Sequence, residues 1–201
     1  MSFDKYGDGQ DPYCYPGTSV LKNRFDLRND EDLREVELYI STKAAERLEF
    51  QNPPYSLDTL KTVHHTLFSD LYNWAGKIRT VKISKSDSQF CVPERIEPEA
   101  SKIFASMASE NWFENCPRST LINSIAESYG NLNVVHPFRE GNGRSQRILF
   151  EWIIVNAGYE INWWAVVRDE WIEANIASYY GDDGRLKEIF NRCLGSPIKE
   201  F

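Results

Sequence analysis

The stretch from His136 to Arg147 combines side chains that suit the chemistry of phosphate groups. Gly141, Asn142 and Gly143 are small or tolerate a left-handed backbone, and a strongly apolar run follows them. At the start of a helix, such residues leave backbone N–H groups and the positive end of the helix dipole open to an anion. The sequence therefore predicts a phosphate-binding loop at this point.

Five side chains of the same stretch have separate parts in this chemistry. Arg144 and Arg147 are three residues apart and project from nearly the same helix face, about 4.5 Å apart along the axis, which suits successive phosphates of one nucleotide. Glu140 is a carboxylate that could hold Mg²⁺ against those phosphates. His136 could take the proton from an attacking hydroxyl. Phe138 is apolar in a polar loop, so we expect it to anchor the loop in the core.

Each of these residue types also has an ordinary structural explanation. A histidine before proline often only ends a helix, Gly-Asn-Gly is often only a turn, and helical arginines usually face solvent. The combination favours function, because Arg144 and Arg147 begin a helix whose N-terminal end disfavours cations and so calls for an anion. The stretch is not a Walker A loop, and it lacks the third glycine of a dinucleotide-binding loop, since Gln146 stands there.

A helix on each side must hold this stretch in place. One helix is expected after Pro117 and should end near Val135, because His136 precedes Pro137 and a residue before proline is pushed out of the helical region. The next is expected over 144–156, within a motif loop and helix that cover 136–157. Its apolar character predicts that it is central in the fold.

The remaining segments predict further helices and one hairpin. Periodic apolar residues and capping residues predict helices from Asn29 or Asp30, from Ser56, and over 97–114, 163–180 and 185–193. Two β-prone runs at 77–83 and 89–92, joined by polar residues, predict a hairpin that leans on the helices. We therefore expect one all-α domain over 1–201 with one small β-hairpin at about 77–92.

The composition excludes several classes of protein. The chain has 201 residues, and its 23 basic and 30 acidic side chains give a net charge of −7. An acidic chain has no general attraction for nucleic acids or anionic lipids, so neither is expected as a partner. The longest apolar stretches are interrupted by Glu151, and no signal peptide is recognisable. We expect a cytoplasmic protein that does not span a membrane.

The four cysteines do not form a metal-binding or disulfide pattern. Cys14, Cys91, Cys116 and Cys193 lie far apart without a CxxC pair, and only three histidines are present. This spacing predicts reduced thiols and gives no local pair of zinc ligands.

Residues 136–147 resemble the motif HPFx(D/E)GNGRxxR of the Fic (filamentation induced by cAMP) family at every defined position. Segments 15–21 and 71–79 also look like that family, so the resemblance covers most of the chain. It implies a helical bundle with a β-hairpin flap, and transfer of AMP from ATP to a protein hydroxyl with release of pyrophosphate. The resemblance makes His136 the general base, Glu140 the Mg²⁺ ligand and Gly141 to Gly143 the phosphate cradle. It also implies that Arg144 and Arg147 hold the outer phosphates of ATP.

The same resemblance implies how a target binds, and it leaves other reactions open. The flap at about 77–92 would dock an extended segment of the target protein by strand addition. A phosphorylating branch of the family carries lysine at the second motif glycine, whereas Gly143 is retained here, which favours AMP transfer. The alternatives are a protein kinase that binds ATP in the reversed orientation, phosphocholine transfer as a remote option, and a non-catalytic module that binds a nucleotide or a partner helix.

Many members of the family are inhibited by a helix with the pattern (S/T)xxxE(G/N), whose glutamate pairs with the second motif arginine, here Arg147. Residues 106–111 fit this pattern with Glu110, but they lie between flap and motif and off the apolar stripe, so a solvated helix face is favoured. The chain then resembles the toxin half of a toxin–antitoxin pair. This branch implies a small helical antitoxin that supplies the glutamate and type II topoisomerase subunits as targets.

Overall fold

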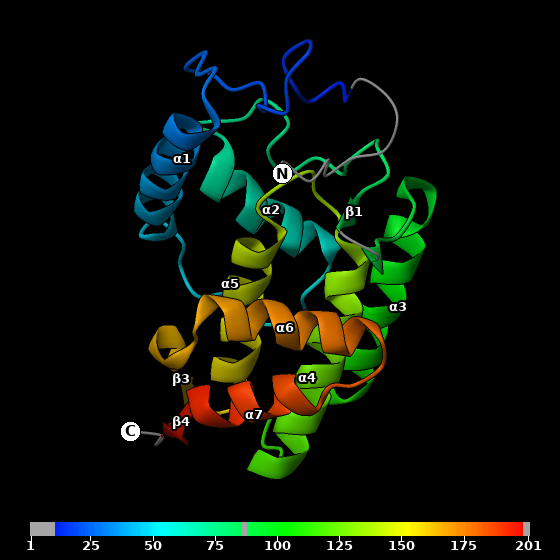
Figure 1. Cartoon of the computed structure of the whole chain (residues 1–201). Coiled ribbons are helices and arrows are strands. Elements are labelled where there is room, and N and C mark those ends of the chain that lie inside the picture. Colours follow the sequence, from blue (N-terminus) through cyan, green and yellow to red (C-terminus); the bar gives the residue numbers. More distant parts are fainter. Residues whose placement is uncertain (1–10, 86–87, 199–201) are drawn as a thin grey trace.

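The computed structural model describes residues 11–85 and 88–198, and it is mainly helical (Figure 1). The strands are short, and each pairs with one antiparallel neighbour, β1 with β2 and β3 with β4. The prediction of an all-α fold with a small hairpin is confirmed, and the β3–β4 pair is an addition to it. The elements are α1 (Asp30–Ala45), α2 (Leu57–Phe68), β1 (Ser84–Lys85), β2 (Ser88–Gln89), η1 (Pro93–Arg95), α3 (Ile96–Ser109), η2 (Asn111–Phe113), α4 (Arg118–Val135), α5 (Asn142–Asn156), β3 (Tyr159–Ile161), η3 (Trp163–Ala165), α6 (Arg168–Tyr179), α7 (Gly184–Cys193) and β4 (Leu194–Pro197).

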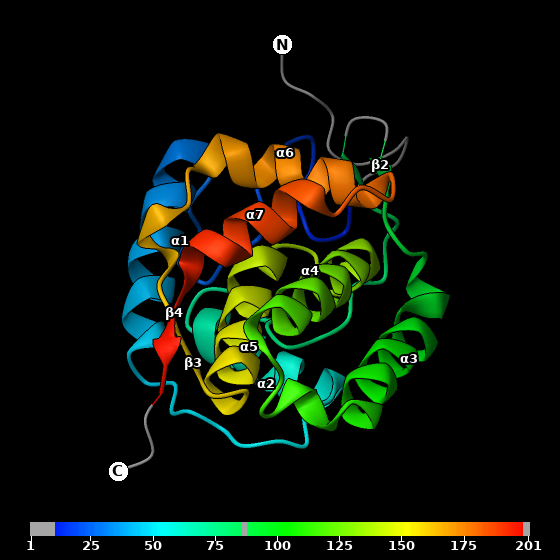
Figure 2. The ribbon, with the colours of Figure 1, turned by 90° about the horizontal axis from the view of Figure 1, so that it is seen from below.

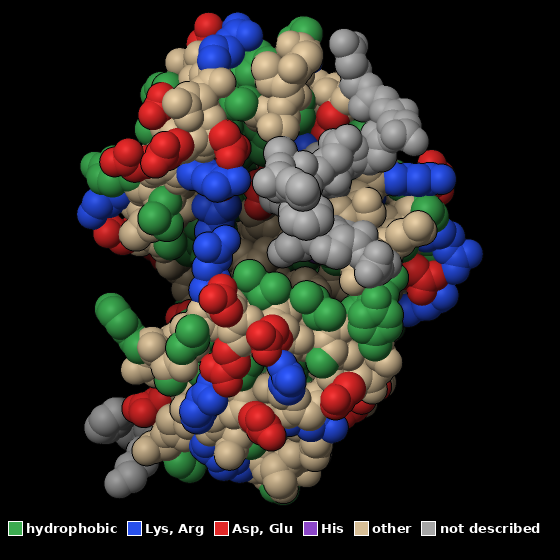
Figure 3. Space-filling model, viewed as in Figure 1, with side chains coloured by type: hydrophobic (Ala, Val, Ile, Leu, Met, Phe, Trp, Pro, Cys, Tyr) green, Lys and Arg blue, Asp and Glu red, His purple; other side chains and the backbone are tan. Residues whose placement is uncertain are grey.

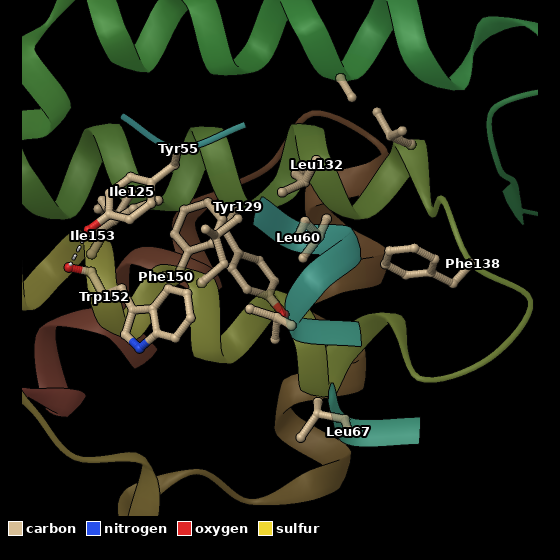
Figure 4. Packing of buried hydrophobic residues seen from close by; sticks show 14 of the residues in the cluster. Tyr55, Leu60, Leu67, Ile125, Tyr129, Leu132, Phe138, Phe150, Trp152 and Ile153 are labelled. Carbon is tan, nitrogen blue, oxygen red and sulfur yellow. Dashed lines mark hydrogen bonds between the residues drawn. The ribbon is translucent and has the colours of Figure 1, made fainter. Parts of the chain in front are cut away.

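Helices α4 and α5 form the centre of the molecule, and Figure 2 shows them surrounded by the other helices. Several apolar side chains of α5, among them Leu149, Phe150 and Ile153, are fully buried. Tyr129 of α4 meets Phe150 edge to face, with the ring centroids 5.0 Å apart (Figure 4). This packed pair of helices is the rigid frame for the loop between them, as the sequence predicted.

Three predicted helix boundaries are wrong. Of the helix expected over 163–180, α6 begins only at Arg168, and the short helix η3 precedes it. The helix expected over 97–114 ends at Ser109, because the three residues of η2 have positive φ angles of 49, 54 and 63°. This turn brings Trp112 and Phe113 into the core, and the gain from burying two aromatic rings outweighs the unfavourable backbone. Helix α5 begins at Asn142 and not at Arg144, because Gly141 in the left-handed region already serves as its N-cap.

The hairpin is shorter than predicted. Its strands pair Ser84 with Gln89 and Lys85 with Ser88, and the turn at 86–87 lies outside the described residues. Residues 77–83 form no strand, because this segment is arranged around the buried Arg79. The hairpin does lean on a helix, since the hydroxyl of Tyr179 in α6 bonds both the N–H and the carbonyl of Gln89, each at 3.1 Å.

The segment before α1 packs on the core. Residues 1–10 lie outside the described part, while Cys14 forms a β-bridge with Leu21. All four cysteines are free thiols, as predicted. Among the described residues, none of the helices has the combination of length and apolar character that crossing a bilayer requires.

Candidate active site

The stretch singled out by its chemistry forms the loop between α4 and α5. His136 is the C-cap of α4 and adopts the left-handed conformation, with φ 47° and ψ 62°, so the helix ends where Pro137 predicted. Gly141, also left-handed with φ 79°, starts α5. The loop therefore places His136 at the end of one central helix and the two arginines on the first turns of the next.

The imidazole of His136 is held by a carbonyl and by the flap. Its Nδ1 lies 3.2 Å from the carbonyl oxygen of Asn133, and because a carbonyl only accepts, Nδ1 is the nitrogen that carries the proton. In the neutral ring Nε2 then has the lone pair, as a general base requires. Phe90, next to β2, stacks on the imidazole with the centroids 3.8 Å apart. The flap and the histidine are thus in direct contact.

Asn142 and Phe138 fix the loop from the inside. Phe138 is fully buried, which is the position that an anchor occupies. The side-chain oxygen of Asn142 accepts from the Phe138 N–H at 2.8 Å, and its amide nitrogen donates to the Phe138 carbonyl at 2.7 Å. The side chain of Asn142 therefore closes the loop on itself.

A histidine that sequence reasoning passed over supports the loop. His64 of α2 is fully buried and stacks on Phe138 at 3.9 Å. Its Nδ1 accepts from the N–H of Gly76 at 2.8 Å, so Nε2 carries the proton and donates to the Glu140 carbonyl at 2.9 Å. Burial lowers the pKa of His64 to about 3, so the ring is neutral at physiological pH.

The neutral His64 predicts a dependence of stability on pH. The unfolded chain takes up a proton at His64 near pH 6.5 and the folded chain does so only near pH 3, so this stabilisation is complete above pH 6.5 and is lost as the pH falls towards 3. We expect the free energy of unfolding between pH 6.5 and 5 to fall with a slope that approaches one proton. His64→Gln should remove this component in urea titrations, while His65→Gln, at an exposed position, should keep it. Equal slopes in wild type and His64→Gln would contradict the assignment.

Two glycines of the predicted cradle have different structural requirements. A Cβ atom on Gly141 would lie 2.4 Å from the ring of Phe68, at a backbone φ that L side chains rarely adopt. A Cβ on Gly143 would meet nothing within 4 Å. Gly141 is therefore required by the chain's own packing, whereas Gly143 is not.

This difference gives a matched pair of variants. Gly141→Ala should lower the free energy of unfolding by about 2 to 4 kcal/mol, through left-handed strain and overlap with Phe68. Gly143→Ala should stay within about 1 kcal/mol of the wild type, since alanine is the better helix former. Chemical denaturation of both variants tests this. Equal stabilities of the two variants would show that the ring of Phe68 moves aside without cost.

The two arginines differ in their partners. Arg144 forms an ion pair with Glu37 of α1 and donates to the Ser41 hydroxyl at 3.0 Å. Within the described residues, the half-buried Arg147 makes no side-chain hydrogen bond or ion pair. On the face of the molecule seen in Figure 3, Lys and Arg side chains form a line beside a hollow. An unpaired guanidinium near a helix start is a position for a bound anion.

The string that fits an inhibitory pattern does not approach these arginines. Glu110 is the exposed C-cap residue of α3, and its carboxylate lies 3.5 Å from the hydroxyl of Ser124 in α4. Ser106 is exposed as well. Both residues therefore lie on a solvated helix face, which the sequence favoured for them.

Glu140 offers oxygen atoms of the kind that Mg²⁺ prefers. Its Oε1 accepts from the N–H of Gly141 at 3.2 Å, and its backbone carbonyl is held by His64. In the described part of the chain, no three His, Cys, Asp or Glu side chains are grouped so that they could hold a metal ion. One carboxylate next to a phosphate-binding helix start fits Mg²⁺, which usually binds through one or two carboxylates and the substrate's phosphates.

Two buried arginines, which sequence reasoning did not place in the site, support the loop from behind. Arg79 is 1% exposed and donates only to backbone carbonyls, among them that of His136 at 2.7 Å. Arg139 is equally buried, and its guanidinium pairs with Asp11, with a closest distance of 2.6 Å. Both flanks of the loop are therefore held by segments distant in sequence.

Comparisons with known proteins agree with this geometry. The model of the Fic/DOC family matches residues 54–154. The chain is 33% identical over 191 residues to the "Probable protein adenylyltransferase Fic" of Escherichia coli (strain K12), covering 95% of this chain and 96% of that protein. It is 35% identical over 193 residues to the protein adenylyltransferase VbhT of Bartonella schoenbuchensis, covering 94% of this chain and 40% of VbhT.

The fold of this chain is similar to that of a solved structure. The N-terminal Fic domain of a VirB-translocated Bep effector protein from Bartonella quintana, with bound ADP, superposes with a TM-score of 0.83 at 26% identity. The match covers 93% of this chain and 95% of that chain. The similarity thus extends well beyond the segment that the family model matches.

Proposed function

We propose that this chain, which belongs to the Fic/DOC family, is a protein adenylyltransferase that transfers AMP from ATP to a hydroxyl side chain of a target protein. The observation that carries the proposal is the loop between α4 and α5. It places a histidine with Nδ1 protonated at the end of one helix and Arg147, without a partner among the described residues, on the first turns of the next. The adenylyltransferase names of the relatives and the ADP in the neighbouring structure support the choice of nucleotide.

The proposed reaction uses each group for one task. Nε2 of His136 takes the proton of the target hydroxyl as its oxygen attacks the α-phosphorus of ATP. The bond from the α-phosphorus to the oxygen bridging to the β-phosphorus breaks, and pyrophosphate leaves. The N–H groups at the start of α5, with Arg144 and Arg147, stabilise the charge that develops on the phosphates. Mg²⁺, held by Glu140 and the phosphates, would supply further positive charge.

The proposed target segment binds along the flap. Strand addition to a hairpin gives main-chain hydrogen bonds without demanding a particular sequence. Phe90 connects β2 to the imidazole of His136, so a strand docked on this hairpin would pass near the base. This contact supports a target with an extended segment that carries serine, threonine or tyrosine.

We further propose that the protein is a toxin acting in the cytoplasm on type II topoisomerase subunits, and that a small helical antitoxin inhibits it in trans. The support for the antitoxin is that Arg147 has no partner among the described residues. Glu110, the carboxylate that the inhibitory pattern suggested, contacts Ser124. A glutamate from a second protein would then be the group that pairs with Arg147.

The reaction is tested by supplying ATP labelled at either the α- or the γ-phosphate to the purified protein with a bacterial lysate. Protein-bound label from the α position only is the expected result, and mass spectrometry of the labelled proteins identifies the target. Label from the γ position only would contradict AMP transfer and indicate a protein kinase that binds ATP in the reversed orientation. If no label is transferred from either position, the protein is a non-catalytic module that binds a nucleotide or a partner.

A further inference from the structure

The guanidinium group of Arg144 is fixed by residues of α1 and α2. One terminal nitrogen, Nη2, pairs with the carboxylate of Glu37, and the other, Nη1, donates to the Ser41 hydroxyl at 3.0 Å. The guanidinium carbon lies 4.6 Å from the ring centroid of Phe68, so the group also has an aromatic ring against one face. Both terminal nitrogens of Arg144 and one face of its guanidinium group are therefore in contact with residues of α1 and α2.

The carboxylate of Glu37 is itself held at both oxygens. Oε1 accepts from Arg144, and Oε2 accepts from the hydroxyl of Tyr72. Tyr72 is buried and stacks on Trp74, with the centroids 4.4 Å apart. Burial, and then the neighbouring Glu37, raise the pKa of Tyr72, so its hydroxyl keeps the proton that it donates. The chain of contacts runs from the core through Tyr72 and Glu37 to Arg144.

Arg144 keeps donors for a ligand in spite of these contacts. A guanidinium has five N–H bonds, and Glu37 and Ser41 use two of them. Three remain for phosphate oxygens. Arg147 has no comparable support from the described residues, so the two arginines of the motif differ in how far they are fixed before a ligand binds.

We propose that Glu37 is a positioning residue, which fixes Arg144 in advance for the outer phosphates of ATP and makes α1 a part of nucleotide binding. A cation held in place loses less side-chain entropy when the phosphate binds. The inference rests on the proposed function of Arg144. The opposite role, in which the carboxylate competes with phosphate for Arg144, predicts tighter ATP binding in Glu37→Ala.

The test is the affinity of the full chain for ATP and for AMP, measured by titration calorimetry. Glu37→Ala should weaken ATP binding about tenfold, the size expected for a lost charge-assisted hydrogen bond. AMP binding should be unchanged, because AMP has no outer phosphates. Glu37→Gln should bind ATP nearly as well as the wild type, since the amide oxygen still accepts from Arg144 and the amide nitrogen can donate to Tyr72.

A double-mutant cycle separates positioning from a general effect on the fold. In the Arg144→Ala background, Glu37→Ala should have no further effect on ATP binding, because the residue through which it acts is gone. Glu35→Ala, at an exposed position of the same helix, is the matched control and should bind ATP like the wild type. If Glu37→Ala does not fold, Ser41→Ala, which removes only the bond to Nη1, should still weaken ATP binding two- to threefold.

Three results would overturn the inference. They are tighter or unchanged ATP binding in Glu37→Ala, an equal loss of AMP binding, and an undiminished effect in the Arg144→Ala background. The α-label experiment decides the proposed function separately. A wild type that transfers no AMP yet shows the Glu37 effect on ATP binding would support the positioning role and contradict the enzyme.

Discussion

Replacing His136 with alanine should reduce AMP transfer by roughly 10²- to 10⁴-fold, the range for loss of a general base. The remaining groups would still bind ATP, so its affinity should change little. The imidazole of His136 contacts the carbonyl of Asn133 and the ring of Phe90, and neither contact ties it to the arginines. The measurement is single-turnover transfer of α-phosphate label to the identified target, together with ATP binding by the same sample.

His65→Ala is the control for this variant, because it removes an exposed imidazole of α2 and should transfer AMP at the wild-type rate. Circular dichroism should show both variants folded. Wild-type transfer by a folded His136→Ala protein would exclude His136 as the base. A loss of ATP binding as large as the loss of transfer would assign it a role in binding instead.

The backbone of the candidate site could be predicted because the site lies in one continuous stretch. A histidine before proline indicates that α4 ends at His136, and a glycine before an apolar helix suits the left-handed conformation of Gly141, without any tertiary contact. The central position of α5 was equally readable, since its apolar residues cover most of its surface. Local sequence is enough where the backbone alone decides the geometry.

The supporting residues were missed because their partners are far away in the sequence. Glu37 and Arg144 are 107 residues apart, and His64 and Glu140 are 76 residues apart. A weaker signal was nevertheless present. Glu37 lies four residues from Leu33 and from Ser41, and both of these are buried. His64 likewise falls on the apolar stripe of its helix. A polar residue on a buried stripe indicates a specific partner, since it would otherwise lose its hydrogen bonds.

Arg79 is the strongest example of such a residue, and its role also explains why 77–83 is not a strand. Its guanidinium donates to the carbonyls of Val81, Cys91, Val135 and His136. These groups belong to the two sides of the hairpin, the end of α4 and the loop between α4 and α5. Within 77–83, the Val81 carbonyl accepts from this side chain and the backbone N–H of Arg79 donates to the Pro137 carbonyl, so these groups bond outside a strand ladder.

Arg79→Leu should therefore lower the free energy of unfolding by about 3 kcal/mol or more, since several carbonyls would be left in the core without a donor. Arg79→Lys should fall between this variant and the wild type, because one ammonium group cannot reach carbonyls placed around a planar fork. Arg95→Leu is the matched control, as Arg95 is exposed and pairs with Glu99 on the surface, and it should change the free energy of unfolding much less than Arg79→Leu. Urea denaturation measures all three.

The same variants distinguish support of the fold from support of the base. Arg79 Nε bonds the backbone of His136, and so Arg79→Lys should lose AMP transfer even at a temperature where denaturation curves show it to be folded. ATP binding by this variant should be retained, because Arg144 and Arg147 are held by α5. A folded Arg79→Lys protein with wild-type transfer would show that the loop keeps His136 in place without the arginine. In that case the carbonyl contacts would serve stability alone.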